Sequence, residues 1–150
     1  MKPLIVLLTF FVISIAAIKL INEVTNIPLA GRIAMAAMLV FTAVGHFAFT
    51  KGMSMMLPDF VPFKTETIYL TGLIEVAAAI GLLTLGLKHI TGWLLIVFFL
   101  LLLPANIYAA FKHVDYQKGT LDGPGLTYLW FRVPLQLLFI VWTYLSAIRF

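Results

Sequence analysis

Residues 67–87, TIYLTGLIEVAAAIGLLTLGL, form an apolar stretch long enough to cross a bilayer as a helix, and Glu75 lies near its middle. A carboxylate at such a position costs about 2.5–3.5 kcal/mol on insertion scales. At about 100° per residue, small and polar side chains share the face of Glu75: Thr71, Gly72, Ala78, Ala79, Leu82 and Gly86. Because small residues let helices approach closely, we expect this face to meet helices that supply polar partners.

The composition of the whole chain agrees with a membrane protein. Of its 150 residues, 63% are hydrophobic and 11% are charged, whereas soluble domains are about half apolar and a quarter charged. The chain has no cysteine, which excludes disulfides, thiolate nucleophiles and cysteine-ligated metal centres. Its net charge of +4 is divided among the expected helix ends, which is typical of membrane flanks and not of a nucleic-acid surface. We therefore predict a single all-α integral membrane domain.

Apolar runs separated by polar segments predict five transmembrane helices, at residues 3–21, 30–50, 65–87, 90–111 and 126–148. The segment between the second and third helices, KGMSMMLPDFVPFK at 51–64, is too short to span and too apolar for a free loop. We expect it to lie in the interface or over the mouth of the bundle. Lysine and arginine divide almost equally between the two sides, so the orientation stays open.

The polar side chains of these helices gather at one level. Counted inward from the side that holds the segment 51–64, five of them lie roughly five to ten residues deep, at about 1.5 Å per residue: His46, Glu75, Asn106, Arg132 and Gln136. Ionisable residues at such depth normally face a bundle interior and pair with one another. The sequence therefore predicts a polar pocket in which Glu75 and Arg132 form a charge pair. His46, Asn106, Gln136 and Tyr108 would complete its hydrogen bonds.

Other interpretations of the same residues stay open. The pair of Glu75 and Arg132 is equally well explained as a structural tether, since buried pairs can fix packing without chemistry. A single intramembrane histidine, His46, is more often a hydrogen-bonded bundle residue than a metal ligand, and it cannot supply bis-histidine haem ligation. We therefore predict neither a metal site nor a protein-bound redox centre.

A succession of short motifs resembles the DoxX-like family of small bacterial membrane proteins: Gly45-His46-Phe47, Met56-Leu57-Pro58, Tyr69-Leu70-Thr71-Gly72-Leu73-Ile74-Glu75, Pro104-Ala105-Asn106-Ile107-Tyr108 and Arg132-Val133-Pro134-Leu135-Gln136. The resemblance covers roughly residues 30–148. It implies a four-helix transmembrane bundle, with residues 3–21 as an additional N-terminal helix. It also implies a bacterial cytoplasmic membrane location and an association with membrane oxidoreductase systems. NACHO, an assembly chaperone of nicotinic receptors, is a more distant resemblance.

These observations support three hypotheses for the function. The first is a non-catalytic accessory subunit that binds a quinone or a lipid-like molecule through the predicted pocket, with a membrane oxidoreductase or another copy of the chain as partner. The second is an isomerase-like acid–base enzyme in which Glu75 and His46 transfer a proton on an apolar substrate. The third is an assembly chaperone for another membrane protein. A transporter is disfavoured, because the polar cluster is confined to one half of the bilayer and the sequence has no inverted repeat.

Overall fold

The computed structural model describes residues 2–115, 118–123 and 125–149, and every regular element in this part of the chain is helical. The elements are α1 (Lys2–Asn22), α2 (Ile27–Ala48), α3 (Thr50–Ser54), α4 (Lys64–Leu83), α5 (Lys88–Phe111), the 3-10 helix η1 (Gly125–Tyr128), α6 (Leu129–Thr143) and the π-helix η2 (Tyr144–Arg149). By length and composition, five helical segments could cross a membrane, the last of them running from Gly125 to Arg149. The predicted all-helical architecture is confirmed.

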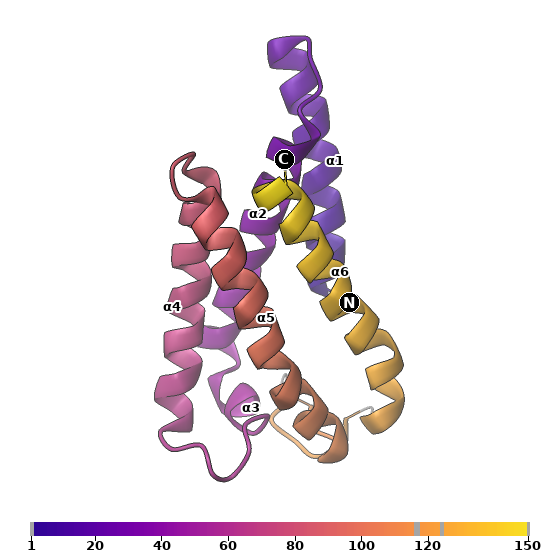
Figure 1. Ribbon diagram of the computed structural model, residues 1–150. Coiled ribbons are helices and arrows are strands. Elements are labelled where there is room, and N and C mark those ends of the chain that lie inside the picture. The colour runs from indigo at the N-terminus through magenta and orange to yellow at the C-terminus, as the bar shows by residue number, and fades with distance from the viewer. Residues whose placement is uncertain (1, 116–117, 124, 150) are drawn as a thin grey trace.

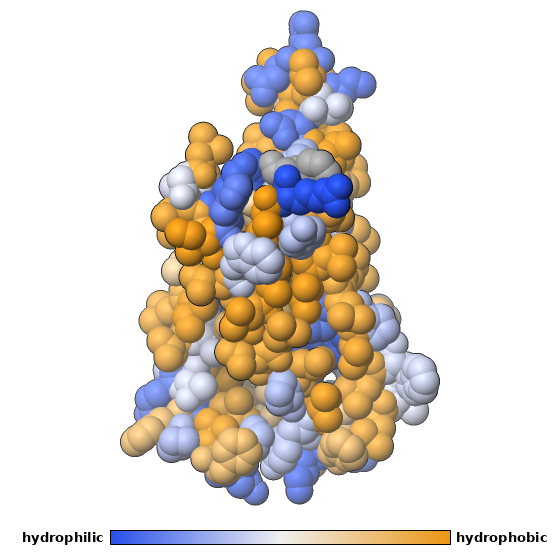
Figure 2. All heavy atoms as spheres, in the orientation of Figure 1, coloured by the Kyte–Doolittle hydropathy of each residue, from blue (hydrophilic) through white to orange (hydrophobic). Residues whose placement is uncertain are grey.

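The helices form one bundle around α2 (Figure 1). α2 packs most extensively, against α4 on one side and α1 on the other, and α5 and α6 complete the bundle. Half of the apolar window of α2 is buried, against 17% for α1. α1 begins at about mid-height of the bundle, and the turn that joins it to α2 projects beyond the other helices (Figure 1). The face of the molecule in Figure 2 is largely hydrophobic over the height of the bundle, as expected for contact with acyl chains.

The core is built from small and branched apolar side chains that allow close helix packing. The cluster consists of Leu7, Ala34, Met35, Ala36, Met38, Leu39, Ala79, Leu82, Leu95, Phe99, Leu135, Phe139 and Ala147. α1 joins this core through Leu7, which is fully buried, and through an edge-to-face contact between Phe11 and Trp142 with ring centroids 4.8 Å apart. The indole N–H of Trp142 also donates to the carbonyl of Gly31 at 3.0 Å. One aromatic side chain of α6 thus holds both α1 and α2.

The second helix begins at residue 27, three residues earlier than the sequence analysis placed it. The side chain of Asn26 accepts a hydrogen bond from the amide of Leu29 at 3.1 Å, and Pro28 occupies the first turn. An Asn cap followed by a proline is a favourable helix start, because the Asn side chain accepts from a first-turn amide and proline has no amide to leave unpaired. The expected start at residue 30 overlooked this cap.

The third helix ends at Leu83, not at residue 87. Thr84 takes an extended backbone conformation (φ −90°, ψ 118°), and its hydroxyl donates to the carbonyl of Ile80 at 3.0 Å. The chain then turns through Leu87, whose amide donates to the Thr84 carbonyl at 3.0 Å. Lys88, expected in the turn, is the first residue of α5. Local hydroxyl bonding of this kind competes with the helix and ends it early.

The last span is not a uniform α-helix over residues 126–148. It begins as the 3-10 turn η1 and changes at Tyr144 to the π-helix η2. The hydroxyls of Thr143 and Ser146 donate to the carbonyls of Phe139 and Trp142, both at 2.8 Å. These bonds occupy carbonyls of the preceding turn and accompany the change to the wider helix.

The segment 51–64 contains the short helix α3, followed by turns up to Phe63, whose φ is 52°. α3 packs against α2 and α4 at one end of the bundle. Gly52 is buried there, whereas Phe60 and Phe63 are exposed. This segment therefore covers the bundle end at which α2 finishes and α4 begins.

Candidate functional site

A small cavity lies among the helices at the level of Glu75, with a volume of about 40 Å³. All five long helical segments contribute to its lining: Pro3, Met38, Leu39, Thr42, Glu75, Phe99, Leu102, Arg132, Gln136 and Phe139. A wider depression lies on the outside of α1, but the four residues that line it, Ala16, Lys19, Leu20 and Glu23, are all exposed. We therefore take the internal cavity as the candidate site and call it the Glu75 pocket.

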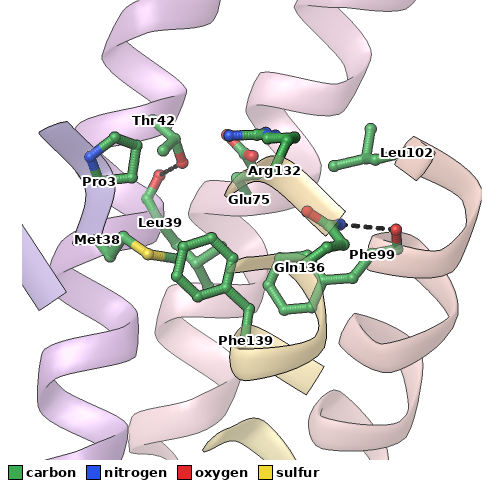
Figure 3. Close-up of a pocket in the computed structure, with 10 residues that line it drawn as sticks. All are labelled: Pro3, Met38, Leu39, Thr42, Glu75, Phe99, Leu102, Arg132, Gln136 and Phe139. Atoms are coloured by element: carbon green, nitrogen blue, oxygen red, sulfur yellow. Dashed lines mark hydrogen bonds between the residues drawn. The ribbon is translucent and has the colours of Figure 1, made fainter. Parts of the chain in front are cut away.

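The ionisable side chains of the Glu75 pocket gather at one end, which Pro3 and Leu102 also line, whereas the opposite end is apolar (Figure 3). Figure 3 shows Thr42, Glu75 and Arg132 together at one end, with Met38 and Phe139 at the opposite end. Along α6 the lining residues pass in the same order, from Arg132 through Gln136 to Phe139, one turn at a time. The pocket therefore has the polarity of an amphiphilic molecule.

The Glu75 carboxylate lies against His46, not against Arg132 as expected. His46 Nε2 is 3.3 Å from Glu75 Oε2, and the exposed fractions of the two residues are 9% and 4%. The distance is that of an ion pair, although Oε2 is outside hydrogen-bond geometry. The contact exists because Gly72 lets α2 and α4 approach: a Cβ built on Gly72 would lie 3.1 Å from the Cβ of His46.

The other ring nitrogen of His46 determines where its proton lies. His46 Nδ1 is 3.2 Å from the carbonyl oxygen of Ile68 and 3.0 Å from the hydroxyl of Thr71. That hydroxyl itself donates to the Ile68 carbonyl at 2.8 Å. Because a carbonyl only accepts, we assign the proton to Nδ1. Nε2, the opposite ring nitrogen, then faces the Glu75 carboxyl group.

Arg132 is left without the carboxylate partner that the sequence predicted. Among the described residues there is no ion pair between Arg132 and Glu75, and Nε of Arg132 is buried without a hydrogen-bond partner. The prediction that Glu75 and Arg132 form a charge pair is therefore wrong. α4 packs closely on α2 and is separated from α6 by the pocket, so the side chain in contact with the Glu75 carboxyl group comes from α2.

Gln136 is 2% exposed, and its amide Nε2 donates to the carbonyl of Phe99 at 2.7 Å (Figure 3). Phe99 precedes Leu100, the residue whose carbonyl loses its helical donor to Pro104. The amide thus bonds α6 to α5 beside the proline kink. One of its two N–H donors is therefore already used in the structure.

Two predicted site residues lie outside the Glu75 pocket. Asn106 is buried one turn beyond Leu102 on the same face of α5, nearer the following loop. Tyr108 is half-buried on another face of α5, and the ammonium of Lys112 lies 5.9 Å from the centre of its ring. The structure brings together Glu75, Arg132 and Gln136 in one pocket, with His46 joined through Glu75.

Sequence reasoning overlooked two polar residues. Thr71 was placed on the face of Glu75 but not recognised as the partner of His46. Arg32 is 5% exposed on α2, and its Nε and Nη1 are buried without hydrogen-bond partners. Its position inside an apolar run was the available signal. Within the part of the chain that the structure describes, no three histidine, cysteine or acidic side chains gather closely enough to hold a metal ion.

The chain is thus a small helical protein whose long apolar helices are of membrane-spanning length. They surround a cavity that two ionisable side chains, Glu75 and Arg132, help to line. The model of a family described as a domain of unknown function (DUF8561) matches residues 35–147, and the chain belongs to this family. The match includes every ionisable residue of the pocket and leaves α1 outside. No curated protein and no solved structure shows significant similarity to the chain.

Proposed function

We propose that this chain is an integral protein of a bacterial cytoplasmic membrane that binds the polar end of a quinone or lipid-like molecule in the Glu75 pocket. It would act as a non-catalytic accessory subunit of a membrane redox system. The observation that carries the ligand-binding proposal is the free Nε of Arg132, a buried donor on the wall of a cavity. A buried donor without an acceptor costs about 1–3 kcal/mol, which an oxygen atom of a ligand would recover.

The redox association is supported by the resemblance of the motifs around His46, Glu75 and Arg132 to the DoxX-like family. That resemblance also supports a core of four transmembrane helices, α2, α4, α5 and α6, with α1 as an addition. The partner would be an oxidoreductase subunit, since the described residues of this chain provide no metal ligand set and no thiol. A second copy of the chain is the alternative partner.

The size of the pocket limits what part of a ligand it takes. Sites for drug-sized ligands enclose about 300–1,000 Å³, whereas the Glu75 pocket has about 40 Å³. A whole quinone ring therefore does not fit without movement of side chains. One oxygen-bearing group does fit, and the apolar remainder of the molecule would lie outside the cavity.

Solvent extraction of the purified protein tests the proposal. The protein is isolated in a mild detergent, and the extract is analysed by mass spectrometry against the same preparation of Arg132→Gln. We expect one class of quinone or lipid to be retained in about equimolar amount by the native chain and lost from the variant. Equal recovery from both proteins, or an empty native protein after gentle extraction, would overturn the proposal.

A second candidate is the acid–base enzyme, favoured by the contact between His46 Nε2 and Glu75 Oε2 at 3.3 Å. One proton held between a carboxyl group and an imidazole can be exchanged with a carbon acid, and contacts of this kind often tighten only when substrate binds. In deuterated water, such an enzyme would remove a proton from a lipid C–H bond and return a deuteron. Incubation with total membrane lipid should then label one species, and Glu75→Gln should abolish the labelling. No label above the level of the variant would exclude this reaction.

A further inference from the structure

We infer that the ligand of the Glu75 pocket is a single-chain amphiphile with one carboxylate, such as a long-chain fatty acid, and that it enters from the bilayer between α5 and α6. This inference rests on the proposed function and narrows it to one headgroup and one route. Four features of the pocket carry it: its charge, its size, the order of its lining and the position of its opening.

The charge of the pocket favours an anion. The proton on His46 Nδ1 is fixed by the Ile68 carbonyl, and Nε2 of the same ring lies 3.3 Å from Glu75 Oε2, so the Glu75 carboxyl group already has a partner on α2. The guanidinium of Arg132 lines the same pocket and, among the described residues, has no acidic partner within ion-pair distance. Buried charges are paired in stable proteins, and Arg presents donors that match a carboxylate.

The charge of Arg132 makes a carboxylate a better ligand than a neutral carbonyl. Gln136 gives one of its two amide N–H groups to the Phe99 carbonyl, and the Nδ1 proton of His46 is used on Ile68 and Thr71. Arg132 is the pocket residue with a buried nitrogen that has no hydrogen-bond partner. A quinone carbonyl could accept a hydrogen bond but would leave the charge unpaired, whereas a carboxylate satisfies both the N–H and the charge.

The volume of the pocket and the arrangement of its polar and apolar lining residues match the head of a fatty acid and the start of its chain. A volume of about 40 Å³ accepts a carboxylate and not a phosphodiester with its glycerol backbone. The polar end, with Thr42 and Arg132, is followed by Met38 and Phe139 at the apolar end (Figure 3). A carboxylate beside Arg132 therefore places the first methylene groups of its chain among apolar side chains.

The opening of the pocket lies on the lipid-facing side of the bundle. Figure 2 shows hydrophilic atoms at the bottom of a recess in the hydrophobic surface, between α5 and α6. Leu102 on α5 and Phe139 on α6 line the pocket from these two helices. An acyl chain can leave the pocket here into other acyl chains without crossing water. Aqueous anions such as inorganic phosphate have no equivalent apolar path.

The test compares molecules that share one acyl chain and differ in the head. The protein is delipidated in a neutral maltoside detergent, and its thermal unfolding is followed by tryptophan fluorescence with palmitate, hexadecanol, methyl palmitate or a decyl quinone. We expect saturating palmitate to raise the unfolding temperature by about 4 °C or more. The three neutral molecules should change it by less than about 1 °C.

Variants assign the effect to the site. Arg132→Gln should lose the response to palmitate. Leu102→Trp, which fills the mouth of the pocket, should weaken it. Lys112→Gln, an exposed cation outside the pocket, should keep it in full. If Arg132→Gln fails to fold, Arg132→Lys serves instead, because it keeps the charge and should retain a reduced response.

Each outcome separates this inference from the proposed function. If the decyl quinone or methyl palmitate stabilises the protein as much as palmitate does, the inference of a carboxylate head is wrong. The proposed binding of a ligand in the pocket is then still supported. Stabilisation by palmitate that persists in Arg132→Gln, or disappears in Lys112→Gln, overturns the site. If no amphiphile stabilises the protein and solvent extraction also finds no ligand, both the inference and the proposed function fail.

Discussion

His46 Nε2 lies 3.3 Å from Glu75 Oε2 across the packed faces of α2 and α4, while Nδ1 on the far side of the same ring faces the Ile68 carbonyl at 3.2 Å. His46 therefore bridges two groups of α4, the backbone carbonyl of Ile68 and the carboxyl group of Glu75. This arrangement fixes the ring and the tautomer. It also explains how an acid is accommodated at the centre of an apolar helix without direct pairing to Arg132.

The first prediction concerns the acid. Glu75→Gln places an amide donor opposite Nε2 of His46, so we expect a loss of unfolding free energy below about 1 kcal/mol. Glu75→Leu removes the partner and leaves Nε2 buried and unsatisfied, which should cost about 1–3 kcal/mol. Thermal unfolding in detergent, followed by tryptophan fluorescence, measures both. Equal losses in the two variants would show that His46 does not depend on a donor at position 75.

The second prediction concerns the close approach of α2 and α4. A Cβ on Gly72 would lie 3.1 Å from His46 Cβ and 3.2 Å from a ring carbon of Phe47. Gly72→Ala should therefore force the helices apart and cost about 1–3 kcal/mol.

Gly45→Ala on α2 is the matched control for Gly72→Ala. A Cβ at Gly45 meets only the methyl of Met53 at 3.5 Å, an ordinary contact, and alanine is the better helix former. Unfolding of the two purified variants is compared under one condition, and the control should be neutral or stabilised by up to about 1 kcal/mol. A Gly72→Ala protein as stable as the control would remove the steric basis of the contact between His46 and Glu75.

The sequence was sufficient to predict the helical architecture and the common depth of the polar side chains. Hydropathy locates apolar helices, and counting along each helix gives depth, because the rise per residue is constant. By this means Glu75, Arg132 and Gln136 were expected at one level, and they line one pocket.

The depth of a residue in the bundle does not determine which side chain it contacts, and the predicted partner of Glu75 was wrong for this reason. Glu75 was paired with Arg132 because both are charged, but the register between α2 and α4 at Gly72 brings His46 to the carboxylate first. Tyr108 matched the level and not the face of α5 that meets the pocket. The observed helix ends differ from the predicted ones where hydroxyl and amide side chains hydrogen-bond to the backbone, as at Asn26 and Thr84. These details depend on side-chain direction, which hydropathy does not encode.

The third prediction concerns the bond between α5 and α6. Gln136→Met preserves the volume of the side chain and removes the donor to the Phe99 carbonyl. Interhelical hydrogen bonds in membrane proteins contribute about 0.6 kcal/mol on average and about 1.7 at most, so we expect a loss in that range. Gln136→Glu should cost more, because it brings a carboxylate against the carbonyl oxygen. Unfolding temperatures of the three proteins rank them, and a Gln136→Glu chain as stable as the native chain would contradict the buried bond.

The last prediction distinguishes a ligand-binding Arg132 from a structural one. Nε of Arg132 is buried without a partner, and removing a buried charge that has no partner also removes the cost of its burial. Arg132→Leu should therefore unfold at the same temperature as the delipidated native protein or above it. A tether to Glu75 would instead make the same substitution cost about 3–5 kcal/mol, because it leaves a buried charge uncompensated. The comparison is made before and after ligand removal. If Arg132→Leu is destabilised to that extent without ligand, the guanidinium is part of the framework and is not available to a ligand.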